Sequence, residues 1–227
     1  FPVLILVAGV EGAGKSETVN LLNEWMDPRH ILTSAFFAPS DEERERPALW
    51  RFWRALPPKG KIGIFFGAWH TMPIIHRVFG EISEGEFARE ISEIQRFEKM
   101  LCDEGVLLLK YWFHLSKSQQ RKRMKQLASD PKTRWRVTER DREYFKLYKK
   151  FIKVSDPFLR KTTTGEAPWI VVPCCNARIV PSANCSAASS SAAHCDAVSS
   201  PPAGHLMRTM KTCSPVLRPR SPRICCR

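Results

Sequence analysis

The chain of 227 residues has no long hydrophobic segment and very little cysteine over most of its length. No apolar run approaches the 18 or more residues of a membrane-spanning helix, so the sequence excludes a helical membrane protein. Only Cys102 lies among the first 173 residues, and no Cys-x-x-Cys pair occurs anywhere. A disulfide framework and a zinc site are both disfavoured by this pattern, and we expect a cytoplasmic protein.

Aromatic side chains are absent from residues 174–227, although the chain as a whole contains seven Trp, 13 Phe and three Tyr. This segment is instead rich in Ser, Ala, Pro and Cys. Such a composition cannot offset the roughly 1–2 kcal/mol per residue that ordering a backbone costs. We therefore expect a folded domain at 1–173 and a disordered tail at 174–227, either genuine or produced by a frameshift near residues 174–180.

Short apolar runs alternate with segments of helical periodicity in the first 173 residues. We predict strands at 3–8, 31–37, 62–66, 106–112 and 169–172. We predict helices at 15–26, 47–56, from 83 to about 101, at 116–128 and at 138–153. Nearly continuous apolar strands separated by helices are typical of a parallel sheet covered on both faces. The expected fold is therefore a three-layer α/β/α domain with a mainly parallel, five-stranded sheet.

The segment Gly9-Val10-Glu11-Gly12-Ala13-Gly14-Lys15-Ser16 matches the phosphate-binding pattern Gly-x-x-x-x-Gly-Lys-Ser. It follows a predicted strand and opens a predicted helix, which is the context the pattern requires. Glycines let backbone N–H groups turn towards a phosphate, and the helix N-terminus adds partial positive charge. Lys15 would add a full charge, and Ser16 could hold Mg²⁺ through the bound phosphates. We predict a phosphate site at Gly9, Gly12, Gly14, Lys15 and Ser16.

Several further segments resemble the polyphosphate kinase 2 family, in the order in which that family carries them. They are FFAPSDEER at 36–44, LWRFWRALP at 49–57, KYWFHLSK at 110–117, Asp130-Pro131 with Trp135 and Asp141, and APWIVV at 167–172. The resemblance covers about residues 3–178 and is strongest to the N-terminal half of tandem-domain polyphosphate:AMP phosphotransferases. It implies a P-loop kinase fold with a helical lid at about 38–57, and phosphoryl transfer between inorganic polyphosphate and a nucleotide, AMP or ADP, with Mg²⁺.

Three positions depart from the pattern of active members of that family. Glu11 stands where the phosphate loop usually has Asp, so a carboxylate is kept. Phe66 and Gly67 stand where active members have the Mg²⁺-binding acid and the neighbouring Arg. Because phosphoryl transfer depends on positioning and charge stabilisation, we expect a degenerate domain with weak or no activity. The alternative is a non-catalytic module that binds polyphosphate and supports a separate catalytic half, either a second such domain or another copy of the chain.

The net charge of +13 points to an anionic partner. The resemblance suggests Arg51, with Glu11 and Lys15, as a catalytic residue. Lys110, at the end of a predicted strand, and Arg121, on the basic helix that follows, are candidate contacts for a phosphate chain, although a solvated helix face remains the alternative. No nucleic-acid motif occurs, so nucleic acid is disfavoured as a partner. His70, His76 and His114 lack metal-ligand spacing and are interpreted as structural or surface residues.

Overall fold

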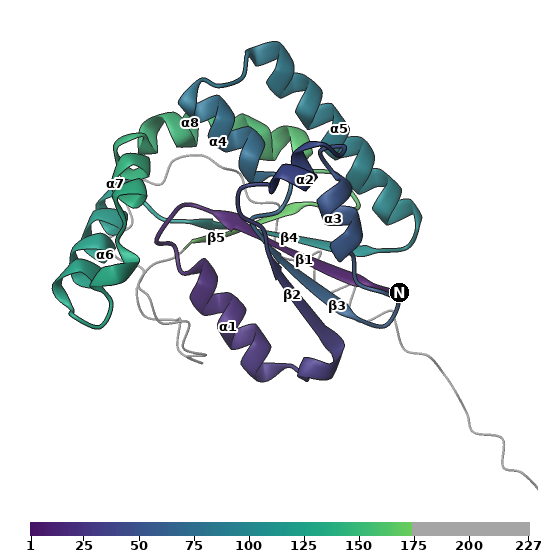
Figure 1. The fold of residues 1–227 in the computed structure, drawn as a ribbon, viewed down its shortest axis with the longest axis horizontal. Helices are drawn as coiled ribbons and strands as arrows, with labels where there is room; N and C mark the ends of the chain where they lie inside the picture. The colour runs from purple at the N-terminus through teal and green to yellow at the C-terminus, as the bar shows by residue number, and fades with distance from the viewer. Residues whose placement is uncertain (174–227) are drawn as a thin grey trace, which may run out of the picture. The chain divides into compact units, whose positions relative to one another are not determined.

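A computed structural model describes residues 1–173 of the chain. Its centre is a five-stranded parallel sheet with the strand order β2-β3-β1-β4-β5 (Figure 1). The strands are β1 (Val3–Gly9), β2 (Ile31–Ala35), β3 (Ile62–Phe66), β4 (Leu107–His114) and β5 (Trp169–Pro173). All five lie where the apolar runs predicted them, and the parallel sheet is confirmed. The predicted tail at 174–227 lies outside the described residues.

The helices between the strands follow the predicted order with three differences, of which the first is that the short helix α2 was not predicted. They are α1 (Lys15–Trp25), α2 (Asp41–Arg44), α3 (Trp50–Ala55), α4 (Thr71–Phe79), α5 (Glu84–Asp103), α6 (Lys117–Ser129), α7 (Glu139–Lys146) and α8 (Tyr148–Thr162), with short 3₁₀ turns η1 (Pro28–His30) and η2 (Arg134–Arg136). Helix α4 was not predicted. The single helix predicted at 138–153 is in fact two, because the chain leaves helical geometry at Leu147, and α8 continues through Pro157.

Alternate residues of the central strand β1 belong to two separate hydrophobic clusters, one on each face of the sheet. Leu4 and Leu6 face the cluster that α3, α4, α5 and α8 complete, and Ile5 and Val7 face the cluster that Val19 of α1 joins. Figure 1 shows α1 on one side of the sheet and α4, α5 and α8 on the other. The three layers are those expected for strands that are apolar on both faces. Within residues 1–173, no helix combines the length and the apolar character needed to cross a membrane.

No residue of the predicted lid, 38–57, is among those that line the cleft over the phosphate loop described below. The ring of Phe52 in α3 is buried, with its centroid 4.7 Å from that of Phe36 and 5.5 Å from that of Trp69. Burying an aromatic side chain of this size anchors a short helix to the core. Helix α3 is therefore part of the layer over the sheet, and the cleft is bordered by another segment, described below.

Lys110 forms a buried charge cluster and is not a phosphate contact. Its side chain is fully buried in the middle of β4, where Lys110 pairs with Leu6 and Trp169 on the neighbouring strands. Its Nζ atom donates to Glu98 Oε2 at 2.7 Å and to the Thr162 carbonyl at 2.6 Å. A cation that is sealed from solvent and paired in this way cannot reach a ligand, so the prediction for Lys110 is wrong.

Glu98 connects this cluster to His70. The second carboxylate oxygen, Oε1, lies 2.6 Å from His70 Nε2 and accepts from Trp69 Nε1 at 3.1 Å. Burial by itself would raise the pKa of Glu98, but His70 and Lys110 outweigh it and lower that pKa. Burial lowers the pKa of His70, so its ring is neutral and its Nε2–H donates to the ionised Glu98. His70 is therefore structural, as predicted.

We expect Lys110→Met to lower the free energy of unfolding by about 3–5 kcal/mol, because it leaves Glu98 as a buried charge with one partner fewer. Urea denaturation of the purified chain measures this difference. Lys99→Met is the matched control, since the exposed Lys99 pairs with Asp103 on the surface, and its loss should cost about 1 kcal/mol or less. Equal effects of the two substitutions would contradict a structural role for the buried cluster.

Candidate phosphate-binding site

The loop between β1 and α1 is held against β4 by a close backbone approach. The Val10 N–H donates to the Phe113 carbonyl at 2.9 Å. Gly9 has a φ of +133°, and a Cβ atom there would lie 2.1 Å from the same carbonyl oxygen. Gly14, with a φ of 84°, precedes the first helical residue, Lys15. Glycine is therefore required at residue 9. The loop places the N-terminus of α1 at the carboxyl edge of the sheet.

Lys15 lies back across its own loop. Its Nζ atom donates to the carbonyl of Val10 at 2.9 Å and to that of Gly9 at 3.3 Å, and it lies 3.3 Å from a carboxylate oxygen of Glu11. Only 8% of Lys15 is exposed. The Lys15 ammonium is thus surrounded by oxygen atoms of its own loop. The oxygen atoms of a bound phosphate would take the place of these contacts.

A cleft of about 510 Å³ opens over this loop. It is bounded by the phosphate loop, by the start of α1, by α6 and by the segment 135–141, which overhangs the loop. The lining residues are Glu11, Gly12, Gly14, Lys15, Ser16, Glu17, Phe66, Gln120, Arg123, Met124, Leu127, Trp135, Arg136, Val137, Thr138 and Asp141. The cleft brings together five predicted site residues, namely Glu11, Gly12, Gly14, Lys15 and Ser16.

Two arginines complete the cleft, and both donate to one oxygen atom of Glu17. Arg123 of α6 and Arg136 of η2 place their Nη2 atoms 3.1 Å and 3.0 Å from Glu17 Oε1. Arg123 was predicted only as part of a basic helix face, and Arg136 was not predicted at all. Its short 3₁₀ turn has no periodic pattern, so only the nearby cluster of basic residues at 132–136 could have indicated it.

Arg121 and Arg51, two further predicted site residues, do not line the cleft. Arg121 is exposed, with its guanidinium over the ring of Phe145, 5.6 Å from the ring centroid. Arg51 in α3 donates to the Phe37 carbonyl at 3.0 Å and lies over the rings of Phe36 and Phe52. Its Nε atom also lies 3.5 Å from Glu43 Oε1, so aromatic faces, a carbonyl and a carboxylate surround the guanidinium on the core side of α3.

Phe66 is among the residues that line the cleft together with Lys15 and Ser16, so a phenyl ring stands where the family pattern has an acid. Gly67 has a φ of +74°, and a Cβ atom there would meet the Phe36 carbonyl at 2.6 Å. The cause is the hydrogen bond from the Phe36 N–H to the Phe66 carbonyl, 2.8 Å, which draws the two strand ends together. An Arg side chain at residue 67 would require the backbone to move.

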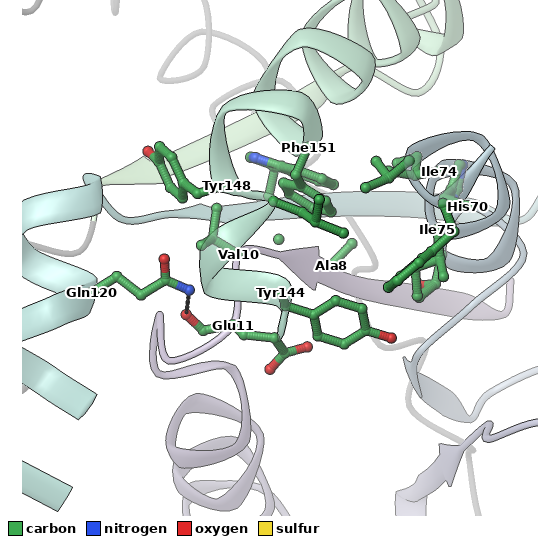
Figure 2. A pocket seen from close by; sticks show the side chains of 16 residues that line it. Ala8, Val10, Glu11, His70, Ile74, Ile75, Gln120, Tyr144, Tyr148 and Phe151 are labelled. Atoms are coloured by element: carbon green, nitrogen blue, oxygen red, sulfur yellow. Dashed lines mark hydrogen bonds between the residues drawn. The ribbon is translucent and has the colours of Figure 1, made fainter. Parts of the chain in front are cut away.

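A second, smaller cavity of about 60 Å³ lies on the other side of the phosphate loop (Figure 2). Its lining is largely apolar and aromatic, and comes from Ile74 and Ile75 of α4, Tyr144 of α7, and Tyr148 and Phe151 of α8. Glu11 and Gln120 belong to both cavities, and Gln120 Nε2 donates to the Glu11 carbonyl at 2.9 Å. A phosphate cleft and an apolar cavity therefore meet at Glu11. No sequence pattern indicated this second cavity, because its residues come from five separate segments.

The parallel sheet, with a Gly-x-x-x-x-Gly-Lys-Ser loop between its central strand and the first helix, defines a P-loop protein. The chain belongs to the polyphosphate kinase 2 family, whose sequence model matches residues 1–199. The family predicted from the motifs is thus confirmed.

Two relatives and one solved structure define the likeness further. A polyphosphate:AMP phosphotransferase of Pseudomonas aeruginosa is 53% identical over 172 residues, which cover 76% of this chain and 35% of that protein. An AMP/ADP-polyphosphate phosphotransferase of Meiothermus ruber is 29% identical, over 75% of this chain and 64% of that protein. The crystal structure of polyphosphate kinase 2 from Arthrobacter aurescens matches with a TM-score of 0.73 and 30% identity, covering 75% of this chain and 60% of that one. The chain thus spans about a third of the length of the Pseudomonas relative.

We expect Gly9→Ala to destabilise the domain more than Gly12→Ala, although both glycines have positive φ angles. A Cβ atom at Gly9 overlaps backbone atoms of Phe113, whereas at Gly12 the nearest atom is Arg123 Cγ, 3.9 Å away. Gly12→Ala should cost about 1 kcal/mol from the backbone conformation alone, and Gly9→Ala at least about twice that. Thermal or urea unfolding of the two variants gives the order, and an equal loss would show that the contact with β4 is unimportant.

Proposed function

We propose that this chain binds inorganic polyphosphate in the cleft over the phosphate loop, as part of a polyphosphate-dependent nucleotide phosphotransferase. The observation that carries the proposal is the convergence of Lys15, Ser16, Arg123 and Arg136 on one cleft that meets an apolar, aromatic cavity at Glu11. A polyanion needs spaced cations and backbone donors, and a nucleoside needs an apolar cavity with a few polar groups. The names of the two relatives support both substrate classes, and we propose AMP as the acceptor because the Pseudomonas relative is named for it.

In this proposal, the backbone N–H groups of residues 12–16 and the Lys15 ammonium hold the terminal phosphate of the chain. Arg123 and Arg136 hold the phosphates that follow. The nucleoside is proposed to enter beside Tyr148 and Phe151, where the cavity of about 60 Å³ must widen to hold it, with its own phosphate at the boundary between the two cavities. Transfer then requires that the acceptor oxygen and the leaving oxygen lie in line across the terminal phosphorus, which the shared boundary of the two cavities favours.

Mg²⁺ is proposed as the cofactor. The oxygen donors that the cleft offers it include the Ser16 hydroxyl and the carboxylates of Glu11 and Asp141, and the described residues hold no cluster of three or more His, Cys, Asp or Glu suited to a metal ion. This set fits an ion that keeps several waters and is held mainly through the phosphates of its ligand. When bound there, Mg²⁺ would neutralise charge that develops on the phosphate oxygens.

We further propose that the chain by itself transfers phosphoryl groups weakly or not at all. Phe66 offers the cleft a phenyl ring, which cannot hold Mg²⁺, and the backbone at Gly67 leaves no room for an Arg side chain. Its role would then be that of a polyphosphate-binding module beside a catalytic partner in the cytoplasm. The partner is proposed to be a second domain of the same family or another copy of the chain.

Lys15→Ala should weaken the binding of tripolyphosphate about 10- to 100-fold, because it removes a charge-assisted contact worth about 1.5–3 kcal/mol. Isothermal titration calorimetry at low salt measures the dissociation constant. Lys125→Ala is the matched control, since Lys125 is exposed on α6 and does not line the cleft. If both variants lose affinity equally, the polyanion is attracted only by the net positive charge and the proposed site is wrong.

The purified chain, incubated with AMP, polyphosphate and Mg²⁺, should form ADP slowly or not at all. Phe66→Asp should raise the rate about tenfold or more, because one missing electrostatic contact can cost roughly 10²–10³ in rate and Gly67 is left unchanged. Phe66→Leu, which removes the ring without adding an oxygen ligand, should not. Rapid ADP formation by the unaltered chain that Lys15→Ala abolishes would overturn the proposed weak activity.

A further inference from the structure

Every cation in the cleft over the phosphate loop is already paired with a carboxylate of the chain. Lys15 lies 3.3 Å from Glu11, and Arg123 and Arg136 both contact Glu17. The cleft is therefore lined by three positive side chains and by the two carboxylates that contact them, those of Glu11 and Glu17. A chain of phosphates can bind only if it takes these cations from their present partners.

Glu17 is placed to compete with a phosphate. It is the residue after Ser16, in the first turn of α1, so its carboxylate lies beside the backbone donors of the loop. Two guanidinium groups from different elements converge on its single Oε1 atom, and both are donors that a phosphate oxygen in the same place would accept from. All three side chains are partly shielded from water, so these contacts are screened less than ion pairs at the open surface.

The contacts of Glu17 agree with this role. Its Oε1 atom accepts from Arg123 Nη2 and from Arg136 Nη2, so a single carboxylate occupies both guanidinium groups. It thus occupies the two arginines as an anion whenever no other anion does.

We propose that Glu17 is an internal counter-ion that occupies the phosphate-binding arginines Arg123 and Arg136, and that a polyphosphate ligand displaces it. The inference rests on the proposed function, since it assigns the two arginines to the phosphate chain. Each phosphate group carries at least as much charge as a carboxylate and has more acceptor oxygens, so it wins this competition once the phosphate loop holds the end of the chain. Glu17 thereby lowers affinity for short or singly charged anions and favours ligands with several phosphates.

The test compares Glu17→Gln with the unaltered full-length chain in the binding of tripolyphosphate and of orthophosphate, without Mg²⁺ and at low salt. Glu17→Gln should bind tripolyphosphate about fivefold to tenfold more tightly, because the ligand no longer displaces two ion pairs that are together worth about 1 kcal/mol or somewhat more. Its affinity for orthophosphate should also rise, so that its preference for the longer ligand falls. Raising the salt concentration should reduce the difference between the two proteins.

Two further variants separate this inference from simple charge effects. Glu24→Gln removes the same charge from an exposed position on α1, and should leave the affinity within about twofold of the unaltered chain. Arg136→Gln in the Glu17→Gln background should abolish most of the gain, because the freed arginine is its source.

The outcomes are distinct. If Glu17→Gln binds tripolyphosphate no better than the unaltered chain, or more weakly, Glu17 positions the arginines instead of competing for them, and the inference is wrong. An equal gain in Glu24→Gln would likewise overturn it. If the unaltered chain shows no binding that depends on Lys15, the proposed function itself fails, and that result does not depend on Glu17.

Discussion

The hydrogen bond from the Val10 N–H to the Phe113 carbonyl is the contact on which the arrangement of the site depends. It fixes the phosphate loop to the end of β4, and Gly9 permits the close approach that this bond requires. The chain leaves β4 through the Ser116 capping box and enters α6, which returns Gln120 to the carbonyl of Glu11 and Arg123 to the cleft. Together with the pairing of β1 and β4 and the hydrogen bond from Gln120, this contact places the phosphate loop beside the basic helix.

The cleft that results is charged but internally neutralised. Lys15 contacts Glu11 and the carbonyls of its own loop, and two arginines contact Glu17. Strong cations in a partly shielded cleft would repel each other without these partners, so the carboxylates stabilise the protein without ligand. The same carboxylates oppose an incoming polyanion. The affinity for polyphosphate is then the difference between the contacts that the cations make with phosphate and those that they make with the carboxylates. Such a site favours ligands that make many contacts at once.

Local sequence patterns predicted most of the fold. Strands that are apolar on both faces appear as short apolar runs, and the phosphate loop appears as a fixed spacing of glycines. Lys110 shows the limit of that reasoning. It lies in an apolar run, and only the register of β4 between β1 and β5, together with Glu98 on α5, decides that its side chain points into the core. The packing of Phe52 on Phe36 and Trp69 shows the same limit, since contacts between distant residues are not visible in spacing. Arg136 was missed because a short 3₁₀ turn has no repeating pattern of apolar residues. The apolar cavity was missed because its lining comes from segments that are far apart in the sequence.

The most direct test of this account is hydrogen–deuterium exchange of the 227-residue chain with and without tripolyphosphate. The account predicts slower exchange of backbone N–H groups in two segments, the phosphate loop at 10–16 and the overhanging segment at 135–141, which border one cleft. Exchange in α2 and α3 at 41–55 should not change, because no residue of these helices lines that cleft. Protection confined to 41–55, or protection of the basic helix α6 without the phosphate loop, would contradict the account.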